Sequence, residues 1–243
     1  MFWYVKFIPE LFCMKKIIIS LVFMVASIHC FAQPISGTTG LLNIPSAEMQ
    51  RDGTFMFGAN YLPEAITHNT WDYNTANYYL NITFFPFWEV NYRMTIFDMG
   101  NGSFNQDRTF AVRGRLLKES KFLPAVVVGG TDIFTSSGGT GNQYFGGFYF
   151  VADKSLYFQK TKLTTTIGYG LNIFRNNQYQ GLFGGLALSP GIFKPITFMV
   201  EYDTKAINAG ASVLLFNHLQ VYAFAYDLKY FCGGIFYKIY LKN

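Results

Sequence analysis

The sequence has few charged residues and, after residue 32, no apolar run long enough to cross a bilayer as a helix. Only 14% of its 243 residues are charged, whereas 51% are hydrophobic and 19% are aromatic. A spanning helix needs about 20 consecutive apolar residues, so the pattern argues against a helical membrane protein. The composition is also too apolar for an ordinary soluble domain, in which about 25% of residues are charged.

Cysteine and histidine are scarce as well, which limits the chemistry that the chain can carry. Of three cysteines, Cys13 and Cys30 lie in the first 32 residues, so only Cys232 follows them. The histidines in that later part are His68 and His218, which are too few to form a zinc site at the usual spacings. The sequence also has no Gly-x-Ser-x-Gly motif. We therefore expect no catalytic residues, no metal site and no cofactor.

Residues 1–32 have the pattern of a secretory signal peptide. A basic pair at positions 15 and 16 precedes an apolar stretch from Ile17 to Ala26, and a cleavage site follows at Ala32. We predict that translation starts at Met14. Cleavage removes three of the 19 basic residues and one of the 14 acidic residues, which leaves a net charge of +3. This small excess argues against a nucleic-acid partner.

The most regular alternation in the chain lies between residues 76 and 97. Apolar residues occupy every second position from Ala76 to Phe84, and the alternation resumes from Trp88 to Ile96 after a turn at residues 85–87. Because successive side chains of a strand point to opposite faces, each run has one apolar and one polar face. Strands of about 9 to 11 residues with this pattern are what a barrel uses to cross a bilayer.

The rest of the chain repeats this unit and predicts an all-β fold. The even strand number agrees with the rule for single-chain bacterial outer-membrane barrels. We predict that residues 54–243 form an antiparallel transmembrane β-barrel of the outer-membrane type. Its twelve expected strands are Thr54–Leu62, Thr75–Phe85, Phe87–Asp98, Arg108–Leu117, Pro124–Ile133, Tyr144–Ala152, Lys162–Asn172, Gly181–Leu188, Pro195–Asp203, Ile207–Phe216, Leu219–Asp227 and Tyr230–Tyr240.

Residues 33–53 precede the first expected strand and are too irregular to span a membrane. A barrel of about twelve strands is wider than an eight-stranded one, whose interior side chains alone can fill. The lumen therefore needs a plug, a channel or a mesh of long charged side chains. We predict a plug in which four residues of this segment tuck into the periplasmic mouth of the barrel: Leu41, Leu42, Ile44 and Pro45.

Charged residues on the expected strands should face the lumen. On the lipid face, an arginine at the bilayer midplane costs about 2–4 kcal/mol, and an acidic residue costs less. Two roles are open for these residues: an ion-pair network that fills the barrel, or a lining for the polar path of a glycan. The candidate lumen-lining residues are Glu89, Arg93, Arg113, Arg115, Glu201 and Asp203.

Several stretches resemble a known family. Gly37–Leu62, which reads GTTGLLNIPSAEMQRDGTFMFGANYL, resembles the opening motif of the YjbH-like exopolysaccharide biosynthesis proteins. Leu123–Lys154 contains PAVVVGGTDIF, GGTG and YFVADK in similar order, and Glu201–Asp203 followed by Asn208 and Gly210 also fits. The resemblance implies an outer-membrane barrel that is associated with secreted or capsular polysaccharide. It supplies no catalytic residues.

These features favour a non-enzymatic barrel in the outer membrane of a Gram-negative bacterium, reached after signal-peptide cleavage. We expect it to serve biosynthesis, export or surface assembly of exopolysaccharide or capsule. Its expected partners are outer-membrane lipid and either polysaccharide or polysaccharide-export proteins, with no nucleic acid. Three alternatives remain open: a membrane-embedded lipid-modifying enzyme that depends on His68 or His218, a general small porin, and a soluble secreted β-sandwich.

Overall fold

The computed structural model describes residues 34–67, 71–99, 102–133, 144–174, 176–193 and 195–242. The predicted signal peptide, Gln33 and His68 lie outside these residues. Within the part of the chain that is described, no helix is both long enough and apolar enough to cross a bilayer.

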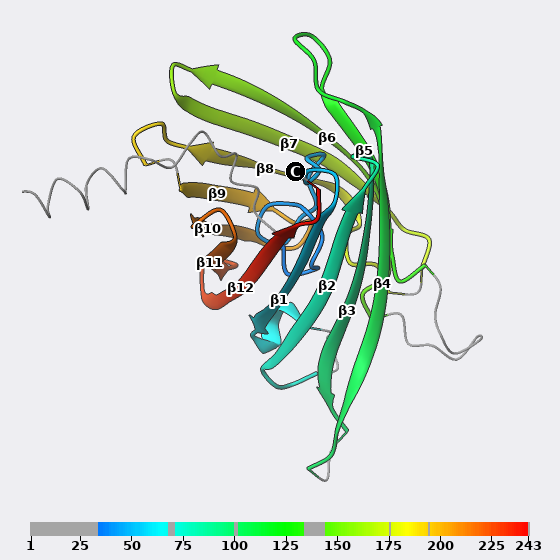
Figure 1. The fold of residues 1–243 in the computed structure, drawn as a ribbon. Coiled ribbons are helices and arrows are strands. Elements are labelled where there is room, and N and C mark those ends of the chain that lie inside the picture. The colour runs from blue at the N-terminus through cyan, green and yellow to red at the C-terminus, as the bar shows by residue number, and fades with distance from the viewer. Residues whose placement is uncertain are drawn as a thin grey trace, which may run out of the picture.

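Twelve antiparallel strands form a closed barrel (Figure 1). Each strand pairs with its neighbours in chain order, and the first strand pairs with the last. The structure thus confirms the predicted all-β fold, an antiparallel barrel of twelve strands. The strands are β1 (Thr54–Leu62), β2 (Thr75–Phe84), β3 (Trp88–Asp98), β4 (Phe104–Leu117), β5 (Ala125–Thr131), β6 (Gly147–Phe158), β7 (Thr161–Leu171), β8 (Gly181–Ser189), β9 (Ile196–Tyr202), β10 (Ile207–Leu215), β11 (Leu219–Tyr226) and β12 (Tyr230–Tyr240), and a short 3-10 helix, η1 (Glu64–Ile66), follows β1.

The two ends of the barrel differ in their connections. At one end, which we call the loop end, long connections include residues 63–74, 132–146 and 172–180. At the other end, the turn end, β2 is joined to β3 by residues 85–87, and β6 is joined to β7 by residues 159–160. The chain also enters β1 and leaves β12 at the turn end, because Thr54 pairs with Tyr240. Short turns on the side of the termini and longer loops opposite are typical of outer-membrane barrels.

Side chains alternate between the lumen and the outer surface as the sequence predicts. On β2, Asn77, Tyr79 and Asn81 are buried, whereas Leu80 between them is 47% exposed. The outward positions of the other strands are also mostly apolar. The exposed outward residues include Phe57, Tyr61, Phe110, Phe150, Ile167, Tyr169, Leu182, Leu186, Val200, Val221 and Ile235.

Two strands are longer than the sequence suggested. β4 begins at Phe104, four residues before the predicted start at Arg108. β6 continues to Phe158, so the long turn predicted at residues 153–161 is wrong. The polar residues Asp153 and Ser155 continue the alternation of β6 and are buried on the lumen side. In the sequence, these lumen-facing polar residues of β6 resembled the polar residues of a turn.

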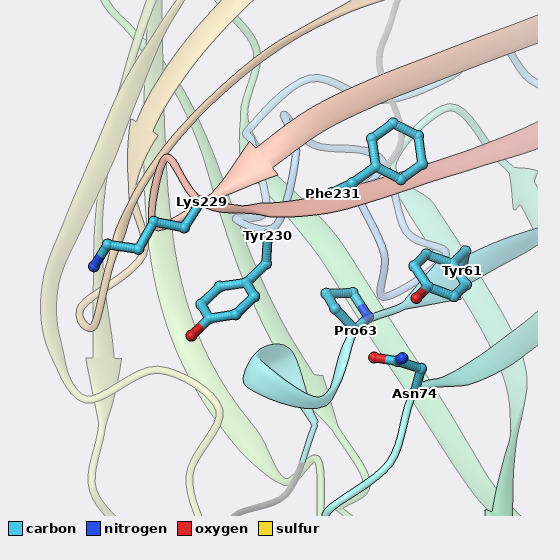
Figure 2. Close-up of a pocket in the computed structure, with 6 residues that line it drawn as sticks. All are labelled: Tyr61, Pro63, Asn74, Lys229, Tyr230 and Phe231. Carbon is cyan, nitrogen blue, oxygen red and sulfur yellow. The ribbon is translucent and has the colours of Figure 1, made fainter.

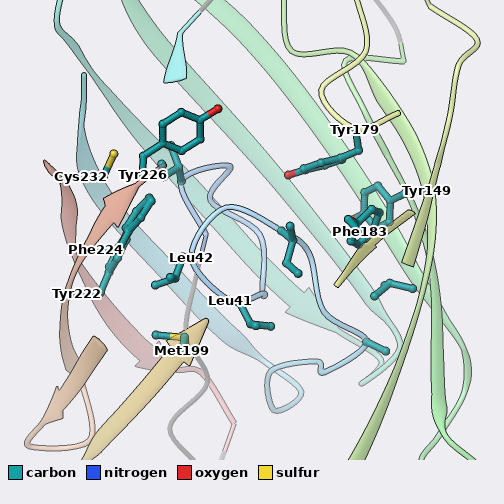
Figure 3. Packing of buried hydrophobic residues seen from close by; sticks show 14 of the residues in the cluster. Leu41, Leu42, Tyr149, Tyr179, Phe183, Met199, Tyr222, Phe224, Tyr226 and Cys232 are labelled. Carbon is teal, nitrogen blue, oxygen red and sulfur yellow. The ribbon is translucent and has the colours of Figure 1, made fainter. Parts of the chain in front are cut away.

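The hydrophobic core lies inside the barrel. Residues 34–53, which we call the interior segment, lie within the ring of strands (Figure 1). Figure 3 shows Leu41 and Leu42 of this segment among side chains from the barrel wall. The residues labelled around them are Tyr179, from the connection between β7 and β8, and the wall residues Tyr149, Phe183, Met199, Tyr222, Phe224, Tyr226 and Cys232. The segment and the wall thus share one core.

Candidate functional site in the barrel lumen

The interior segment folds into a compact loop that makes few hydrogen bonds with itself. Gly40 and Pro45 form an isolated antiparallel bridge, and the N–H of Leu41 donates to the carbonyl of Ile44 at 3.0 Å. Gly37 has φ +82° and packs so closely on the wall that a Cβ would lie 2.6 Å from the Asn91 amide nitrogen. Buried backbone groups need partners, so the wall has to supply the rest of them.

Glu201 of β9 holds the tip of the interior segment. Its carboxylate accepts the backbone N–H groups of Leu42 at 2.9 Å and Asn43 at 2.7 Å. The same carboxylate accepts the side-chain amide of Asn208 at 3.0 Å, and Asp203 accepts the side-chain amide of Asn43 at 2.5 Å. Glu201 and Asp203 are both buried. Hydrogen bonds from N–H donors offset the desolvation of such buried carboxylates.

A second buried carboxylate holds the segment from the opposite side. Glu89 of β3 accepts the backbone N–H of Thr39 at 2.6 Å and its hydroxyl at 2.8 Å. Arg113 of β4 lies 3.5 Å from Glu89, measured from Nε to Oε2, and donates to the carbonyl oxygens of Thr39 and Glu48. This ion pair is completely buried and binds both an N–H and two carbonyl groups of the segment.

A third carboxylate, that of Asp153 on β6, binds the part of the segment that returns toward β1. It accepts the N–H groups of Ala47 at 2.8 Å and Glu48 at 3.1 Å. Lys162 of β7 forms an ion pair with the Glu48 side chain. The sequence analysis missed Asp153 and Lys162 as site residues, because Asp153 was placed in a turn. The period-two pattern from Val151 to Ser155 was the signal that could have placed it in the lumen.

Asparagine side chains bind the beginning of the segment. Asn60 and Asn77 donate to the carbonyl of Ile35 at 3.2 and 3.0 Å. Asn81 and Asn91 donate to the carbonyl of Gly37 at 3.0 and 2.8 Å. The sequence analysis did not single out these asparagines as site residues. Their repeated occurrence on the polar faces of neighbouring strands was the available signal.

Tyr179, in the connection between β7 and β8, binds the tip of the segment from the loop end. Its hydroxyl donates to the carbonyl of Asn43 at 2.6 Å. Burial raises the pKa of Tyr179 well above its ordinary value, since a phenolate here would lose its hydration. The hydroxyl therefore stays protonated and remains a donor at neutral pH.

The predicted plug residues occupy the middle of the lumen. All four of them, Leu41, Leu42, Ile44 and Pro45, are buried. The segment is not confined to a mouth of the barrel, as the sequence predicted, because it extends from the turn end to Asp203 and Tyr179 near the loop end. The deeper position follows from the location of Glu201, which binds the N–H groups beside Leu42.

The structure places five of the six predicted lumen-lining residues inside the barrel. Glu89, Arg113, Glu201 and Asp203 contact the interior segment or its ion pairs. Arg93 is buried but does not bind the segment. Arg115 is the exception to the prediction. It is only half-buried at the turn end, where its guanidinium donates to the carbonyl of Pro86 at 2.5 Å.

A cavity of about 670 Å³ opens above the interior segment at the loop end. Ile35 and Asn43 of the segment form part of its inner surface, and two loops contribute residues 64–67, residues 176–178 and Gln180. Amide, charged and aromatic side chains line it together. The lining is mostly polar, so the cavity is suited to a polar ligand rather than to an apolar one.

Aromatic rings make up one side of this cavity. Trp71 stacks on Tyr73 and Phe97, with ring centroids 5.9 and 5.7 Å apart, and meets Tyr144 edge-on at 5.1 Å. Trp71 and Tyr144 line the cavity directly. The stacking fixes the positions of these rings, so this wall is formed before any ligand binds.

Arg93 lines the cavity, and two carboxylates outside the lining, those of Asp107 and Asp132, act on it electrostatically. The guanidinium of Arg93 lies over the ring of Phe145, 4.3 Å from its centroid. Burial raises the pKa of Asp132 to about 6, the charge of Asp107 contributes in the same direction, and Arg93 opposes both. Asp132 follows the end of β5 at the loop end. Because its pKa is about 6, the charge of Asp132 changes near neutral pH.

A second cavity, of about 500 Å³, lies at the loop end of the seam where β1 pairs with β12 (Figure 2). Tyr61 and Phe231 on its wall are exposed, with ring centroids 6.4 Å apart. The six residues around this cavity are Tyr61, Pro63, Asn74, Lys229, Tyr230 and Phe231. None of them contributes a buried charge, so the lumen is the stronger candidate site.

His218 lies outside both cavities, in the turn between β10 and β11. Its Nδ1 is 2.7 Å from the carbonyl oxygen of Lys238, and its ring stacks on Tyr237. Among the described residues, no group of three or more His, Cys, Asp and Glu side chains has a geometry that could hold a metal ion.

The comparison with protein families agrees with this geometry. Residues 33–179 match the family described as exopolysaccharide biosynthesis protein YbjH, or YjbH. The chain belongs to the YjbH family. The match covers more than half of the 243 residues. No curated protein matches the chain.

The YjbH match includes the interior segment and most of the residues that bind it. Both longer stretches that resembled the family, Gly37–Leu62 and Leu123–Lys154, fall inside the matched range, which ends at Tyr179. Glu201 and Asp203 lie beyond it. The YjbH region of the chain thus supplies the segment and one side of the lumen.

Proposed function

We propose that this protein is a non-enzymatic barrel of the outer membrane that takes part in the export or surface assembly of exopolysaccharide or capsule. It reaches the outer membrane after cleavage of its signal peptide. Its partners are outer-membrane lipid and either polysaccharide or polysaccharide-export proteins. Membership of the YjbH exopolysaccharide biosynthesis family supports the link to polysaccharide.

The outer surface of the barrel supports the membrane location. Soluble monomers rarely expose apolar patches larger than a few hundred Å². Here the outward positions of strands all around the barrel carry exposed apolar side chains, among them Leu80, Ile167 and Val200. Exposed aromatic residues lie near the strand ends, as at the bilayer interfaces of known barrels. At the turn end they include Phe85, Phe87, Trp88, Phe122, Tyr157, Phe158, Phe193 and Phe216.

The observation that carries the proposal is the buried attachment of the interior segment. Carboxylates on β3, β6 and β9 bind its backbone N–H groups from different sides of the lumen. A general porin keeps a water-filled channel, whereas this lumen has a hydrophobic core around Leu41 and Leu42. We therefore favour a barrel whose lumen is closed at rest. The interior segment would move to open the lumen, or the barrel would dock with export proteins, when polysaccharide is exported or assembled.

Deletion of residues 37–47 tests this proposal. It removes the part of the segment bound by Glu89 and Glu201, so single-channel conductance in planar bilayers should rise. The same deletion should lower the amount of polysaccharide on the cell surface. Lys118→Gln, at an exposed position in the turn between β4 and β5, is the control and should change neither quantity.

Two results would contradict the proposal. If the deletion variant still forms a heat-modifiable barrel but leaves conductance and surface polysaccharide unchanged, the segment is not a functional plug. If the wild-type protein leaves with the periplasmic fraction without detergent, the barrel is not in the outer membrane. A closed barrel without free edges should keep its compact gel mobility until it is boiled.

A further inference from the structure

Arg93 is a buried cation with few partners. Its residue is 1% exposed, and its one hydrogen bond to a described residue runs from Nη2 to the Thr109 hydroxyl at 3.4 Å. A guanidinium carries five N–H donors. The Nε of Arg93 has no acceptor among the described residues. The Phe145 ring covers the guanidinium at 4.3 Å but accepts no ordinary hydrogen bond. A buried cation with so few acceptors is unusual, because unsatisfied buried donors are costly.

The neighbouring carboxylates do not neutralise Arg93 directly. Asp107 and Asp132 act on it electrostatically, but neither forms an ion pair with it. Arg113, the other buried arginine of the lumen, is different: it pairs with Glu89 and donates to two backbone carbonyl groups. Arg113 has a structural role, whereas Arg93 keeps donors available at the cavity.

The groups around Arg93 are suited to a sugar chain. Arg93 lines the loop-end cavity together with the aromatic wall that contains Trp71 and Tyr144. The Oε1 of Gln178 in the same cavity is a buried acceptor without a hydrogen-bond partner among the described residues. Asp203 also lines the cavity, but Asn43, Asn208 and two backbone N–H groups already donate to its carboxylate.

We propose that the loop-end cavity binds an anionic sugar unit of a polysaccharide, with the guanidinium of Arg93 as the partner of a carboxylate. The carboxylate fits the planar N–H donors of arginine. Gln178 accepts a sugar hydroxyl, and the aromatic wall covers the apolar face of the sugar ring. This inference rests on the proposed function and names its substrate class as acidic rather than neutral glycan.

Calorimetric titration of the purified full chain in non-ionic detergent tests the inference. The probe is a short oligogalacturonate, whose sugars carry carboxylates, and its methyl ester is the matched uncharged probe. We expect the acid to bind at least about tenfold more tightly than the ester, because a hydrogen bond to a charged group is lost in the ester. Equal affinities for the two probes would overturn the inference.

Arg93→Gln should abolish this preference for the acid. The variant should still fold, because it removes a charge that no ion pair holds. Arg108→Gln is the matched control. Arg108 lies on β4 and pairs with Met94, the neighbour of Arg93 on β3, but its side chain is exposed. It should bind like the wild type. Wild-type affinity for the acid in Arg93→Gln would overturn the proposal, and heat-modifiable mobility checks that the barrel has formed.

Inorganic phosphate separates a sugar site from a general anion site. Phosphate that displaces oligogalacturonate at an equal concentration would show that a bare anion is sufficient, and it would overturn the assignment to a sugar. The surface assay keeps the two proposals apart. If surface polysaccharide depends on this protein but the acid and the ester bind equally, the export proposal stands and the acidic-glycan site fails. If the acid is preferred but surface polysaccharide is unchanged in cells that lack the protein, the acidic-glycan site stands and the export proposal fails.

Discussion

The carboxylate of Glu201 accepts the backbone N–H of Leu42, a residue 159 positions earlier in the chain, at 2.9 Å. The adjacent N–H of Asn43 donates to the other oxygen of the same carboxylate. One side chain thus satisfies consecutive donors at the tip of the interior segment. The closed state of the lumen depends on a contact between the beginning of the chain and its ninth strand.

Replacing Glu201 by glutamine should loosen the tip of the interior segment. The amide keeps the shape of the side chain but puts an NH₂ group against donors, so at least one buried N–H loses its acceptor. Such a loss costs about 1–3 kcal/mol. We expect more frequent opening events in single-channel recordings of Glu201→Gln, with unchanged assembly. Recordings that match both the wild type and Lys118→Gln would show that Glu201 does not hold the segment in place.

The buried pair of Glu89 and Arg113 should be strongly coupled. Arg113→Met leaves the Glu89 carboxylate buried without its cation, and removing one partner of a buried pair costs about 3–5 kcal/mol. The temperature at which gel mobility changes should therefore fall clearly in Arg113→Met. It should recover in part in the double variant with Glu89→Gln. Lys229→Met breaks an exposed pair with Asp227 and should leave this temperature unchanged. Additive effects in the double variant would mean that the two residues act independently.

Arginine at an outward position should impair membrane insertion. Leu80 lies in the middle of β2 and faces outward, so Leu80→Arg would place a charge in the hydrocarbon at a cost of about 2–4 kcal/mol. Phe122→Arg carries the same charge in an exposed turn outside the strands and serves as the control. The measurement is the fraction of protein in the outer membrane. Equal fractions for the two variants would argue that the outer surface does not meet lipid.

Binding of an acidic glycan should strengthen as the pH falls through the titration of Asp132. Its pKa is raised to about 6, so its carboxylate is charged above that pH and neutral below it. Loss of this negative charge beside Arg93 removes repulsion from the ligand, while galacturonate itself stays ionised until about pH 4. We expect an affinity gain of a few-fold to about tenfold between about pH 7 and pH 5.

Asp132→Asn is the variant that assigns this pH dependence. It should bind at pH 7 as the wild type binds at low pH, because the charge is absent throughout. Asp107 remains in the variant and also acts on Arg93, and Glu64 and Asp203 remain in the cavity lining, so a smaller residual change with pH is compatible with the assignment. The same steep gain in Asp132→Asn as in the wild type would exclude Asp132 as its source.

The sequence predicted the barrel well, because strand periodicity is a local signal. β1 and β12 begin and end at the predicted residues, and lumen-facing positions such as Asn81 and Arg93 follow from alternation alone. The signal fails where the polar face meets a polar plug. Around Asp153 and Ser155, several polar residues lie close together in the sequence and resemble a turn. Both side chains nevertheless face the lumen, and Asp153 binds the interior segment there.

The path of the interior segment could not be predicted in the same way. Its backbone is held by side chains such as those of Glu89 and Glu201, which are 50 to 159 positions away from the groups that they bind. No periodicity within residues 34–53 specifies these partners. The apolar character of Leu41 and Leu42 indicated burial, but the depth of burial depended on where the carboxylates lie in the finished barrel.

The hydrogen bonds of the interior segment also constrain the order of assembly. The segment precedes β1 in the chain, yet its carboxylate partners lie on β3, β6 and β9. Contacts between residues far apart in sequence form late, because the chain between them must first be ordered. The part of the described chain that is synthesised first is therefore fixed in place only after most of the wall exists. We therefore expect that closure of β1 onto β12 and filling of the lumen by the segment both belong to the last stage of folding.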